Sequence, residues 1–236
     1  MNLDVVIPTF MREEKLKRAL LSVNEAMEQC GKDVQVRIKV YYSHAGEFSS
    51  ATKGMDWAWI EHHLLPQVSS KFKLPDFWND RLRESTADAM CYLTDDVLLN
   101  RYCLAIAAME IKKMEFDGVI GFNIENITEP YQPCLAAFGI IGLKYADRFK
   151  DRQVFCPDYT SLYADLEVEK QATILGRFKF HKACILVHFH PAYTLSEGKD
   201  ATHLHTRRDF DKDRTTYDRR MARDLVWGLS GELINK

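Results

Sequence analysis

The sequence predicts an α/β fold, in which a mixed, mostly parallel sheet is flanked by helices within a single domain. Two observations carry this prediction. The chain opens with a short apolar strand, a tight turn and an amphipathic helix, which is how a doubly wound domain begins. Across its 236 residues there is also no internal repeat and no low-complexity linker that would mark a second domain.

The first quarter of the chain contains a strand, a helix and a second strand. Residues 3–7 are a compact, mostly apolar segment that Pro8, Thr9 and Phe10 close, which predicts a strand. Residues 11–28 place apolar side chains on one side at helical spacing. Residues 34–42 alternate as a strand does, and a polar loop is expected over residues 43–47.

The next segment is less regular. Residues 49–75 contain two adjacent histidines and favour a helix followed by a short strand near residues 64–68. Adjacent histidines lack the i, i+4 spacing of a metal-binding helix, so packing is favoured for both. A charged helix over residues 79–88 then leads into an apolar run from Ala89, which predicts a buried central strand.

The later elements continue the pattern. A helix is expected over residues 97–114 and a strand over residues 118–124. Residues 128–143 contain Gly and Pro and are expected to cross one face of the sheet. Residues 157–176 indicate a loop that runs into a helix, and residues 178–190 indicate a last strand.

The composition is that of an ordinary globular protein, with 46% hydrophobic and 28% charged residues. A net charge of -2 argues against a protein that mainly coats nucleic acid. Six cysteines without a CxxC pair indicate neither a zinc ribbon nor a disulfide framework, so a reducing compartment is expected. No apolar run approaches the roughly 18 to 20 residues of a membrane span, and the start does not resemble a signal peptide, so we expect a cytoplasmic protein.

Two carboxylates, Asp95 and Asp96, stand where the central apolar run ends. Ligands of open α/β sheets bind beyond the carboxyl ends of strands, and adjacent acids there suit a hard divalent cation that holds phosphate oxygens. The alternative is that both acids open the next helix, because Asp is a favoured N-cap. Taken alone, the acids favour the two interpretations equally.

Four blocks of the sequence resemble the glycosyltransferases with the GT-A fold, a Rossmann-like fold, and in particular those of the family 2 type. Residues 3–23 are similar to the opening strand and helix of that family. Residues 78–96 match, without a gap, its segment from an Asn-containing helix to the DxD motif. Residues 163–168 resemble the acidic motif of the catalytic base, and residues 187–190 resemble a His-containing strand end.

The resemblance implies a site for Mn²⁺ or Mg²⁺. Asp96 is then the direct metal ligand, Asp95 lies beside it toward the ribose or the metal, and His188 is a further ligand. His188 and His190 share one face of the strand, so either one is a candidate, and an ordinary polar strand end is the alternative for both. The resemblance further implies that Asp165 is the base that activates the acceptor, with Glu167 in reserve.

Other residues of the matching blocks imply nucleotide contacts. Pro8, Thr9 and Arg12 follow the first strand, and Asn79 opens the second block. Each acidic or basic candidate also has a simpler interpretation. Arg12 would be a solvated first-turn residue, and Asp165 and Glu167 would be acids that favour the start of a helix.

Two departures from the family pattern stand out. The second strand of that family usually ends with an acid that helps to hold the nucleotide base, whereas here no Asp follows it. Base recognition is therefore expected from Ser43, His44 or a stacked Tyr. The first acid of the DxD motif is replaced by Thr94, although its last carboxylate, which carries the metal contact in the family, is present.

The tail holds charges of both signs. Dense mixed charge over residues 203–223 usually indicates a solvated helix or loop, although Arg207 and Arg208 are candidates for a lid over the donor. Residues 221–234 are expected to form an amphipathic helix. We expect residues 1–191 to form the nucleotide-sugar-binding catalytic domain and residues 192–236 to pack on the site or close over it.

The predicted function is transfer of a sugar, with inversion, from a nucleotide-sugar donor to a hydroxyl acceptor. A UDP-sugar is the first candidate donor, and the acceptor is left open among a glycan, a lipid-linked sugar, a protein and a modified nucleic acid base. One alternative is a non-catalytic member of the fold that binds a nucleotide or glycan, motivated by the missing acid. The other is a sugar nucleotidyltransferase, which the missing Gly-rich phosphate loop disfavours.

Overall fold

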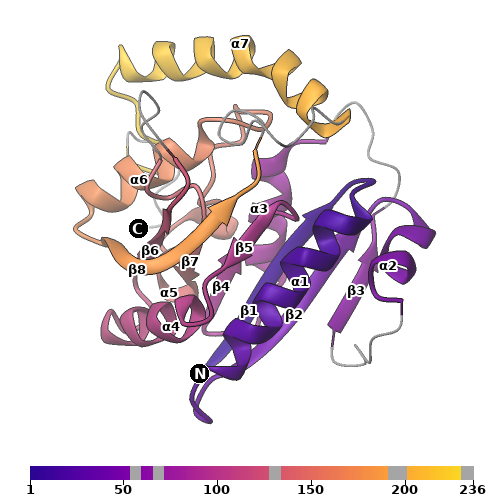
Figure 1. Cartoon of the computed structure of the whole chain (residues 1–236). Coiled ribbons are helices and arrows are strands. Elements are labelled where there is room, and N and C mark those ends of the chain that lie inside the picture. The colour runs from indigo at the N-terminus through magenta and orange to yellow at the C-terminus, as the bar shows by residue number, and fades with distance from the viewer. Residues whose placement is uncertain (54–59, 66–71, 128–133, 191–200, 230–236) are drawn as a thin grey trace.

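The computed structural model describes residues 1–53, 60–65, 72–127, 134–190 and 201–229, with the backbone alone for Ala45 and residues 201–208. Its elements, shown in Figure 1, are in chain order β1 Asn2–Thr9, α1 Glu13–Glu28, β2 Gln35–Tyr42, α2 Ala45–Ala51, β3 Ile60–Leu64, α3 Leu74–Glu84, β4 Ala89–Tyr92, β5 Val97–Leu99, α4 Cys103–Lys113, β6 Val119–Ile124, β7 Gly139–Gly142, α5 Leu143–Ala146, the 3₁₀ helix η1 Lys150–Arg152, α6 Ala164–Ile174, β8 Phe178–His188 and α7 Ala201–Met221. No described helix has the length and apolar character to cross a membrane.

Eight strands form one sheet in the order β3-β2-β1-β4-β7-β6-β8-β5. The neighbours from β3 to β4 are parallel, as are β6 and β8. Strand β7 runs antiparallel to β4 and β6, and β5 runs antiparallel to β8. The predicted fold class, a mixed and mostly parallel sheet flanked by helices, is therefore confirmed.

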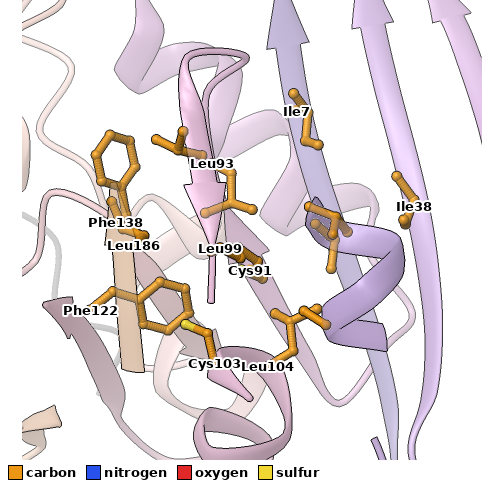
Figure 2. Close-up of a cluster of buried hydrophobic side chains, with 14 of the residues drawn as sticks. Ile7, Ile38, Cys91, Leu93, Leu99, Cys103, Leu104, Phe122, Phe138 and Leu186 are labelled. Carbon is orange, nitrogen blue, oxygen red and sulfur yellow. The ribbon is translucent and has the colours of Figure 1, made fainter. Parts of the chain in front are cut away.

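Two apolar layers hold the helices on the sheet. Strand β1 is buried on both faces, because Leu3, Val5 and Ile7 pack in one layer and Val6 packs in the other. One layer joins β1, β2 and β4 to α1 and α4, and Figure 2 shows part of it between Ile7, Leu104 and Phe122. The other layer packs α3, α5 and α6 against the opposite face. This burial from both sides explains why β4 is a continuous apolar run, and why the centre of β1 is apolar apart from Asp4, which is ion-paired with Lys39.

The strand register brings distant parts of the chain to one edge of the sheet. Thr9 at the end of β1 pairs with Tyr42 at the end of β2. Tyr92 at the end of β4 lies opposite Gly139 at the start of β7, because that pair is antiparallel. His188 at the end of β8 pairs with Val97. The loops after β1, β2, β4 and β8 therefore open at this edge, which we call the carboxyl edge.

Three helix predictions need correction. The helix expected over residues 97–114 is divided, because Val97–Leu99 is strand β5 and α4 begins only at Cys103. The charged helix expected over residues 79–88 lies earlier, at α3. Helix α7 ends at Met221 and turns follow to residue 229, so the helix expected over residues 221–234 is wrong for its described part, and residues 230–236 lie outside the described residues.

Other differences concern segments with weak patterns. The polar loop expected over residues 43–47 is already helix α2 from Ala45. Strand β3 lies before the predicted strand at residues 64–68, most of which falls outside the described residues. Residues 128–143 were expected to cross a face, but they contain β7, an inner strand. A Cβ atom on Gly142 would lie 2.0 Å from the Phe116 carbonyl oxygen, so close backbone approach requires glycine there and weakens the strand pattern.

Candidate functional site

The acidic pair Asp95 and Asp96 lies in the connection between β4 and β5 at the carboxyl edge. The backbone N–H of Phe189 donates to the Asp96 carbonyl oxygen at 2.8 Å, which ties this connection to the end of β8. Because a strand follows the acids, the alternative interpretation as a helix N-cap is wrong. Both side chains are buried, with 2% and 5% of their residue surface exposed, so they need partners.

Arg12 is the main cationic partner of the pair. Its Nη1 atom lies 2.8 Å from Asp95 Oδ1 and 3.2 Å from Asp96 Oδ2. The Thr9 hydroxyl lies within hydrogen-bond distance of Asp95 Oδ2, at 2.7 Å. Arg12 is itself buried, so its interpretation as a solvated first-turn residue is wrong. The structure thus brings together Thr9, Arg12 and both acids, which the sequence analysis named as nucleotide or metal contacts.

His188 at the end of β8 lies beside Asp96, because its register partner on β5 is Val97. Its Nε2 atom lies 3.5 Å from Asp96 Oδ1, which also accepts a hydrogen bond of 2.5 Å from the Thr94 hydroxyl. The backbone of His188 is held by Asn126, which exchanges two hydrogen bonds with it at 2.8 and 2.9 Å. The imidazole packs edge-on against the Phe138 ring. These contacts fix the position of the imidazole beside Asp96.

The two acids have opposite pKa shifts. Burial raises the pKa of Asp95 to about 6, and the charge of Asp96 adds to this while Arg12 opposes it. Burial alone would also raise the pKa of Asp96, but the hydrogen bond and charge of His188, with Arg12 and Thr94, lower it well below the usual range. Asp96 is therefore the more firmly ionised of the two carboxyl groups.

Glu47 is a site residue that the sequence analysis did not single out. It comes from the first turn of α2, only 2% of its surface is exposed, and its carboxylate accepts hydrogen bonds from the backbone N–H groups of Arg12 and Ser43 at 3.1 and 3.3 Å. The Thr9 hydroxyl lies 2.9 Å from the same carboxylate. An acid thus stands near the end of β2 after all, but it faces the loop after β1. An isolated Glu in a polar segment gave no signal of this.

The remaining nucleotide-contact candidates divide into two groups. Pro8 is partly buried within β1, and Ser43 follows β2 with its hydroxyl 2.8 Å from His44 Nδ1, so both lie at the carboxyl edge. Asn79 is different, because its amide group exchanges two hydrogen bonds, at 2.8 and 2.9 Å, with the backbone of Phe155. Asn79 is buried and joins α3 to the chain before α6, so its amide group is occupied by these two hydrogen bonds.

Asp165 lies in the first turn of α6 and interacts with the Cys134 thiol. Cys134 begins a segment, residues 134–138, that leads into β7 at the carboxyl edge, and Phe138 at its other end contacts His188 at 4.9 Å between ring centroids. Four peptide steps separate the ends of this segment, so they lie at most about 14 Å apart. The chain segment that Asp165 contacts therefore leads to the edge of the sheet where the predicted metal ligands lie.

The environment of Asp165 suits a proton acceptor. The side chain is partly exposed, and the surrounding protein raises its pKa by desolvation. The Leu166 backbone amide and the Cys134 thiol oppose this rise by hydrogen bonding, whereas the negative charge of Glu169 adds to it. A carboxylate with a raised pKa binds a proton more readily than an ordinary one.

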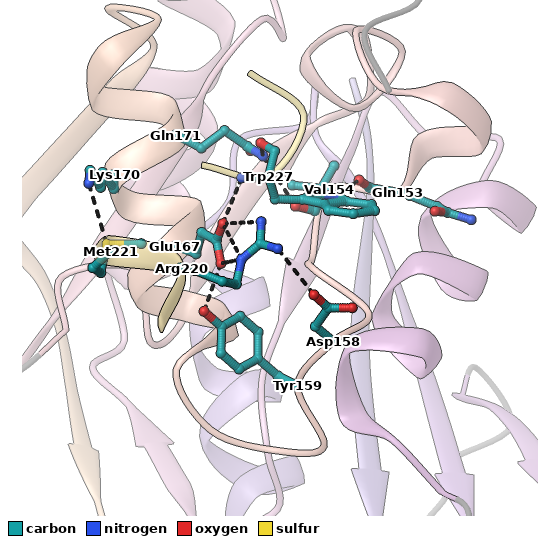
Figure 3. Close-up of polar contacts among 10 residues, drawn as sticks. All are labelled: Gln153, Val154, Asp158, Tyr159, Glu167, Lys170, Gln171, Arg220, Met221 and Trp227. Carbon is teal, nitrogen blue, oxygen red and sulfur yellow. Dashed lines mark hydrogen bonds and ion pairs between the residues drawn. The ribbon is translucent and has the colours of Figure 1, made fainter. Parts of the chain in front are cut away.

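Glu167 is enclosed in a polar cluster, shown in Figure 3. Arg220 donates to both of its carboxylate oxygens, at 2.9 to 3.1 Å, and the Tyr159 hydroxyl and the Trp227 backbone N–H donate at 2.8 and 2.6 Å. Only 1% of Glu167 is exposed. This carboxylate fastens the end of α7 and the turn after it to α6, so it lies away from any acceptor hydroxyl.

The described part of the tail packs onto the chain that precedes Asp165. Asp213 of α7 is fully buried and accepts hydrogen bonds of 2.8 to 2.9 Å from the backbone N–H groups of Thr160, Ser161 and Leu162. In Figure 1, α7 runs along the top of the molecule, toward which β1 and β2 point. The side chains of the lid candidates Arg207 and Arg208 lie outside the described residues.

Some of the side chains at the carboxyl edge fit a divalent cation as ligands. No three His, Cys, Asp or Glu side chains form a metal-holding group within the described ranges. Asp96 and His188 nevertheless lie 3.5 Å apart, close to the separation of about 3 Å expected for adjacent ligands of an octahedral ion. Such ions commonly take their other ligands from substrate phosphates and water. Asp96 and His188 are therefore the residues that fit a cation.

No protein-family model matches the sequence, and no curated protein sequence is significantly similar to it. Among solved structures, the chain resembles the mannosyltransferase PcManGT from Pyrobaculum calidifontis in complex with GDP-Man and Mn²⁺, with a TM-score of 0.62 and 15% identity over 92% of this chain and 64% of that one. Residues 1–349 of S. aureus TarS in complex with UDP-GlcNAc give a TM-score of 0.58 and 15% identity, with 84% and 62% covered.

A structure of S. aureus TarS, of which 37% is covered, gives a TM-score of 0.56 and 14% identity over 81% of this chain. The chain thus spans less than two thirds of the length of each of these structures. At such identities the likeness establishes the fold. It is the GT-A fold of glycosyltransferases, as the sequence resemblance predicted.

Proposed function

We propose that this GT-A chain is a glycosyltransferase that moves a sugar, with inversion, from a nucleotide-sugar donor to a hydroxyl acceptor. One observation carries the proposal. Asp96 and His188 are 92 positions apart in the sequence, but their side chains lie 3.5 Å apart at the carboxyl edge. Ligands of open α/β sheets bind at this edge. Among the structural neighbours, TarS was crystallised with UDP and with UDP-GlcNAc, and PcManGT with GDP-Man and Mn²⁺.

We assign the diphosphate of the donor to Asp96, His188 and Arg12. Asp96 and His188 would hold Mn²⁺ or Mg²⁺, which when bound neutralises the charge that develops on a diphosphate leaving group. Arg12 supplies a second cationic group with a planar, bidentate shape that suits phosphate oxygens. The nucleobase is assigned to the end of β2, where Ser43 and His44 lie beside Phe10.

Asp165 is assigned the role of base. It would accept the proton of the acceptor hydroxyl as that oxygen attacks the anomeric carbon from the side opposite to the leaving nucleotide, which inverts the configuration. Its raised pKa supports the role, and so does its contact with the chain segment that leads to the carboxyl edge. Glu167 is left out of the proposal because Arg220, Tyr159 and Trp227 occupy its carboxylate.

The test is donor turnover. The full chain is incubated with UDP-GlcNAc and with GDP-Man, with and without Mn²⁺, and the released nucleoside diphosphate is measured. We expect slow, metal-stimulated release with one of the two donors, which Asp96→Ala abolishes. The control Asp80→Ala, which removes a surface ion pair with Arg83, should leave the release unchanged. Metal-dependent binding without release in the presence of candidate acceptors would instead favour the non-catalytic alternative. Release that Asp96→Ala leaves intact would refute the assignment.

A further inference from the structure

Arg12 is held so that its guanidinium lies beside both acids. Met11, directly before it, adopts a left-handed φ of 55°, which turns the chain sharply out of β1. The Arg12 backbone N–H then donates to Glu47 at 3.1 Å, and its carbonyl oxygen accepts from Leu16 N–H at 2.9 Å. Both the N–H and the C=O of the Arg12 backbone are therefore hydrogen-bonded. The side chain extends into the protein, and only 7% of it is exposed.

The guanidinium occupies the position that a cation shared by the two carboxylates would take. Its Nη1 atom bonds to one oxygen of Asp95 and to Asp96 Oδ2, whereas Asp96 Oδ1 faces His188 and Thr94. A divalent ion on Asp96 would therefore stand within a few ångströms of a fixed positive charge. In a buried site such like-charge proximity is poorly screened.

We propose that Arg12 competes with a divalent cation for the Asp95–Asp96 pair, and that the diphosphate of the donor ends this competition by drawing the guanidinium onto its own oxygens. The inference rests on the proposed function, and it assigns Arg12 as the residue that couples metal binding to donor binding. Without nucleotide, the pair is already neutralised in part, so the metal binds weakly. With nucleotide, Asp96 is released to the metal.

Coupling of this kind is reciprocal. The factor by which a nucleoside diphosphate tightens Mn²⁺ binding must equal the factor by which Mn²⁺ tightens nucleotide binding. Part of this factor arises in any case, because the diphosphate itself supplies oxygens to the ion. Only the part of the coupling factor that disappears when Arg12 is replaced arises from the competition. Variants of Arg12 therefore separate the two contributions.

The experiment measures Mn²⁺ affinity directly, from free Mn²⁺ in electron paramagnetic resonance titrations of the full chain, alone and with saturating UDP or GDP. The variants are Arg12→Gln, which removes the charge, and Arg12→Lys, which keeps it on a shorter, single-point donor. Arg101→Gln is the matched control, because Arg101 is exposed and contacts the Tyr102 ring. Circular dichroism confirms folding of each variant.

We expect Arg12→Gln to bind Mn²⁺ alone at least about tenfold more tightly than the wild type, because a positive charge beside the carboxylates is gone. Its coupling factor should shrink by a similar amount. The Mn²⁺ affinity of Arg12→Lys should lie between those of Arg12→Gln and the wild type, which provides a second test if the Gln variant does not fold. The Mn²⁺ affinity of Arg101→Gln should match that of the wild type.

Variants that bind Mn²⁺ alone no more tightly than the wild type would overturn the inference. If nucleotide still tightened Mn²⁺ binding in them as in the wild type, the proposed function would stand without it. If no protein bound Mn²⁺ under any condition, both the inference and the proposed metal-dependent function would fail.

Discussion

Arg220 of α7 and Glu167 of α6 form a fully enclosed ion pair, in which 3% and 1% of the two side chains are exposed. The pair joins segments 53 residues apart, and the Trp227 backbone N–H and the Tyr159 hydroxyl complete the shell around the carboxylate, as Figure 3 shows. It makes the described tail part of the folded domain and holds the helix that carries Asp165.

Removing one partner of this pair should destabilise the protein strongly. Glu167→Gln leaves the buried Arg220 with only the half-exposed carboxylate of Asp158 as a counter-ion, 3.1 Å from its Nη1 atom, and breaking a buried pair costs about 3–5 kcal/mol. In a chain of this size the melting temperature should fall by roughly 10 °C, which differential scanning calorimetry measures. Asp218→Asn, which affects an exposed pair with Arg214, should change it little. An unchanged melting temperature for Glu167→Gln would show that the pair does not hold the tail.

Asn79→Ala should act on stability and spare ligand binding. The substitution leaves the buried N–H and C=O of Phe155 without their partner, a loss of about 2–4 kcal/mol. Urea denaturation measures this loss, with Asn24→Ala, which removes an exposed hydrogen bond to Glu28, as the control. Nucleotide affinity of the folded variant should remain within about twofold of the wild type. A large loss of affinity with unchanged stability would instead support the nucleotide contact expected from the sequence.

Glu47→Gln should loosen the loop after β1. The amide that replaces the carboxylate no longer offers two charged acceptor oxygens to Thr9 and to the Arg12 and Ser43 backbones. By analogy with residues that support metal ligands, we expect the KM for the donor to rise about tenfold or more with a smaller change in kcat. Steady-state kinetics measures this, and the exposed Glu25→Gln is the control. Unchanged KM would mean that Glu47 has no part in donor binding.

The rate should depend on pH through Asp165. Its folded-state pKa is raised, mainly by burial, and a base must be unprotonated to act. Activity should therefore fall as the pH decreases through that raised pKa, with a midpoint above the ordinary value of about 3.9 for Asp. A pH profile of kcat/KM tests this. An acidic limb centred at or below the ordinary value would argue against Asp165 as the base.

The same raised pKa has a consequence for stability with a definite sign. Asp165 binds its proton more tightly in the folded chain than in the unfolded one, so ionisation works against the fold. Its contribution to the free energy of unfolding is full below the unfolded pKa and is lost as the pH rises through the folded pKa. Comparing Asp165→Asn with the wild type by denaturation across this range isolates the effect, and a difference of the opposite sign would contradict the burial argument.

The sequence predicted the central elements because burial leaves a pattern. Strands β1 and β4 are covered on both faces, so they are apolar except for Asp4 in the centre of β1, and a charged pair that only two residues separate from β4 is conspicuous. Strand β5 has only three residues and shares its apolar character with α4, so the two looked like one helix. Strand β7 was missed because glycines at both of its ends allow close backbone contacts and carry no side-chain pattern.

The site was predictable where a residue and its motif are local. Asp95, Asp96, Thr9 and Arg12 stand next to strand ends, and topology alone brings those ends together. Glu47, by contrast, acts through contacts that only the turn into α2 creates, and the burial of Glu167 depends on Arg220, 53 residues later. Such pairings between distant segments leave no trace in composition or periodicity.

The central claim is that Asp96 and Asp165 act on one substrate from two sides. The most direct measurement compares donor binding and turnover, by calorimetry with Mn²⁺ and by nucleotide release, in Asp96→Asn and Asp165→Asn. The account predicts that Asp96→Asn loses metal-dependent donor binding, whereas Asp165→Asn binds the donor as the wild type does and loses turnover by a factor of about 10² or more. Two variants that both retain full turnover would contradict it.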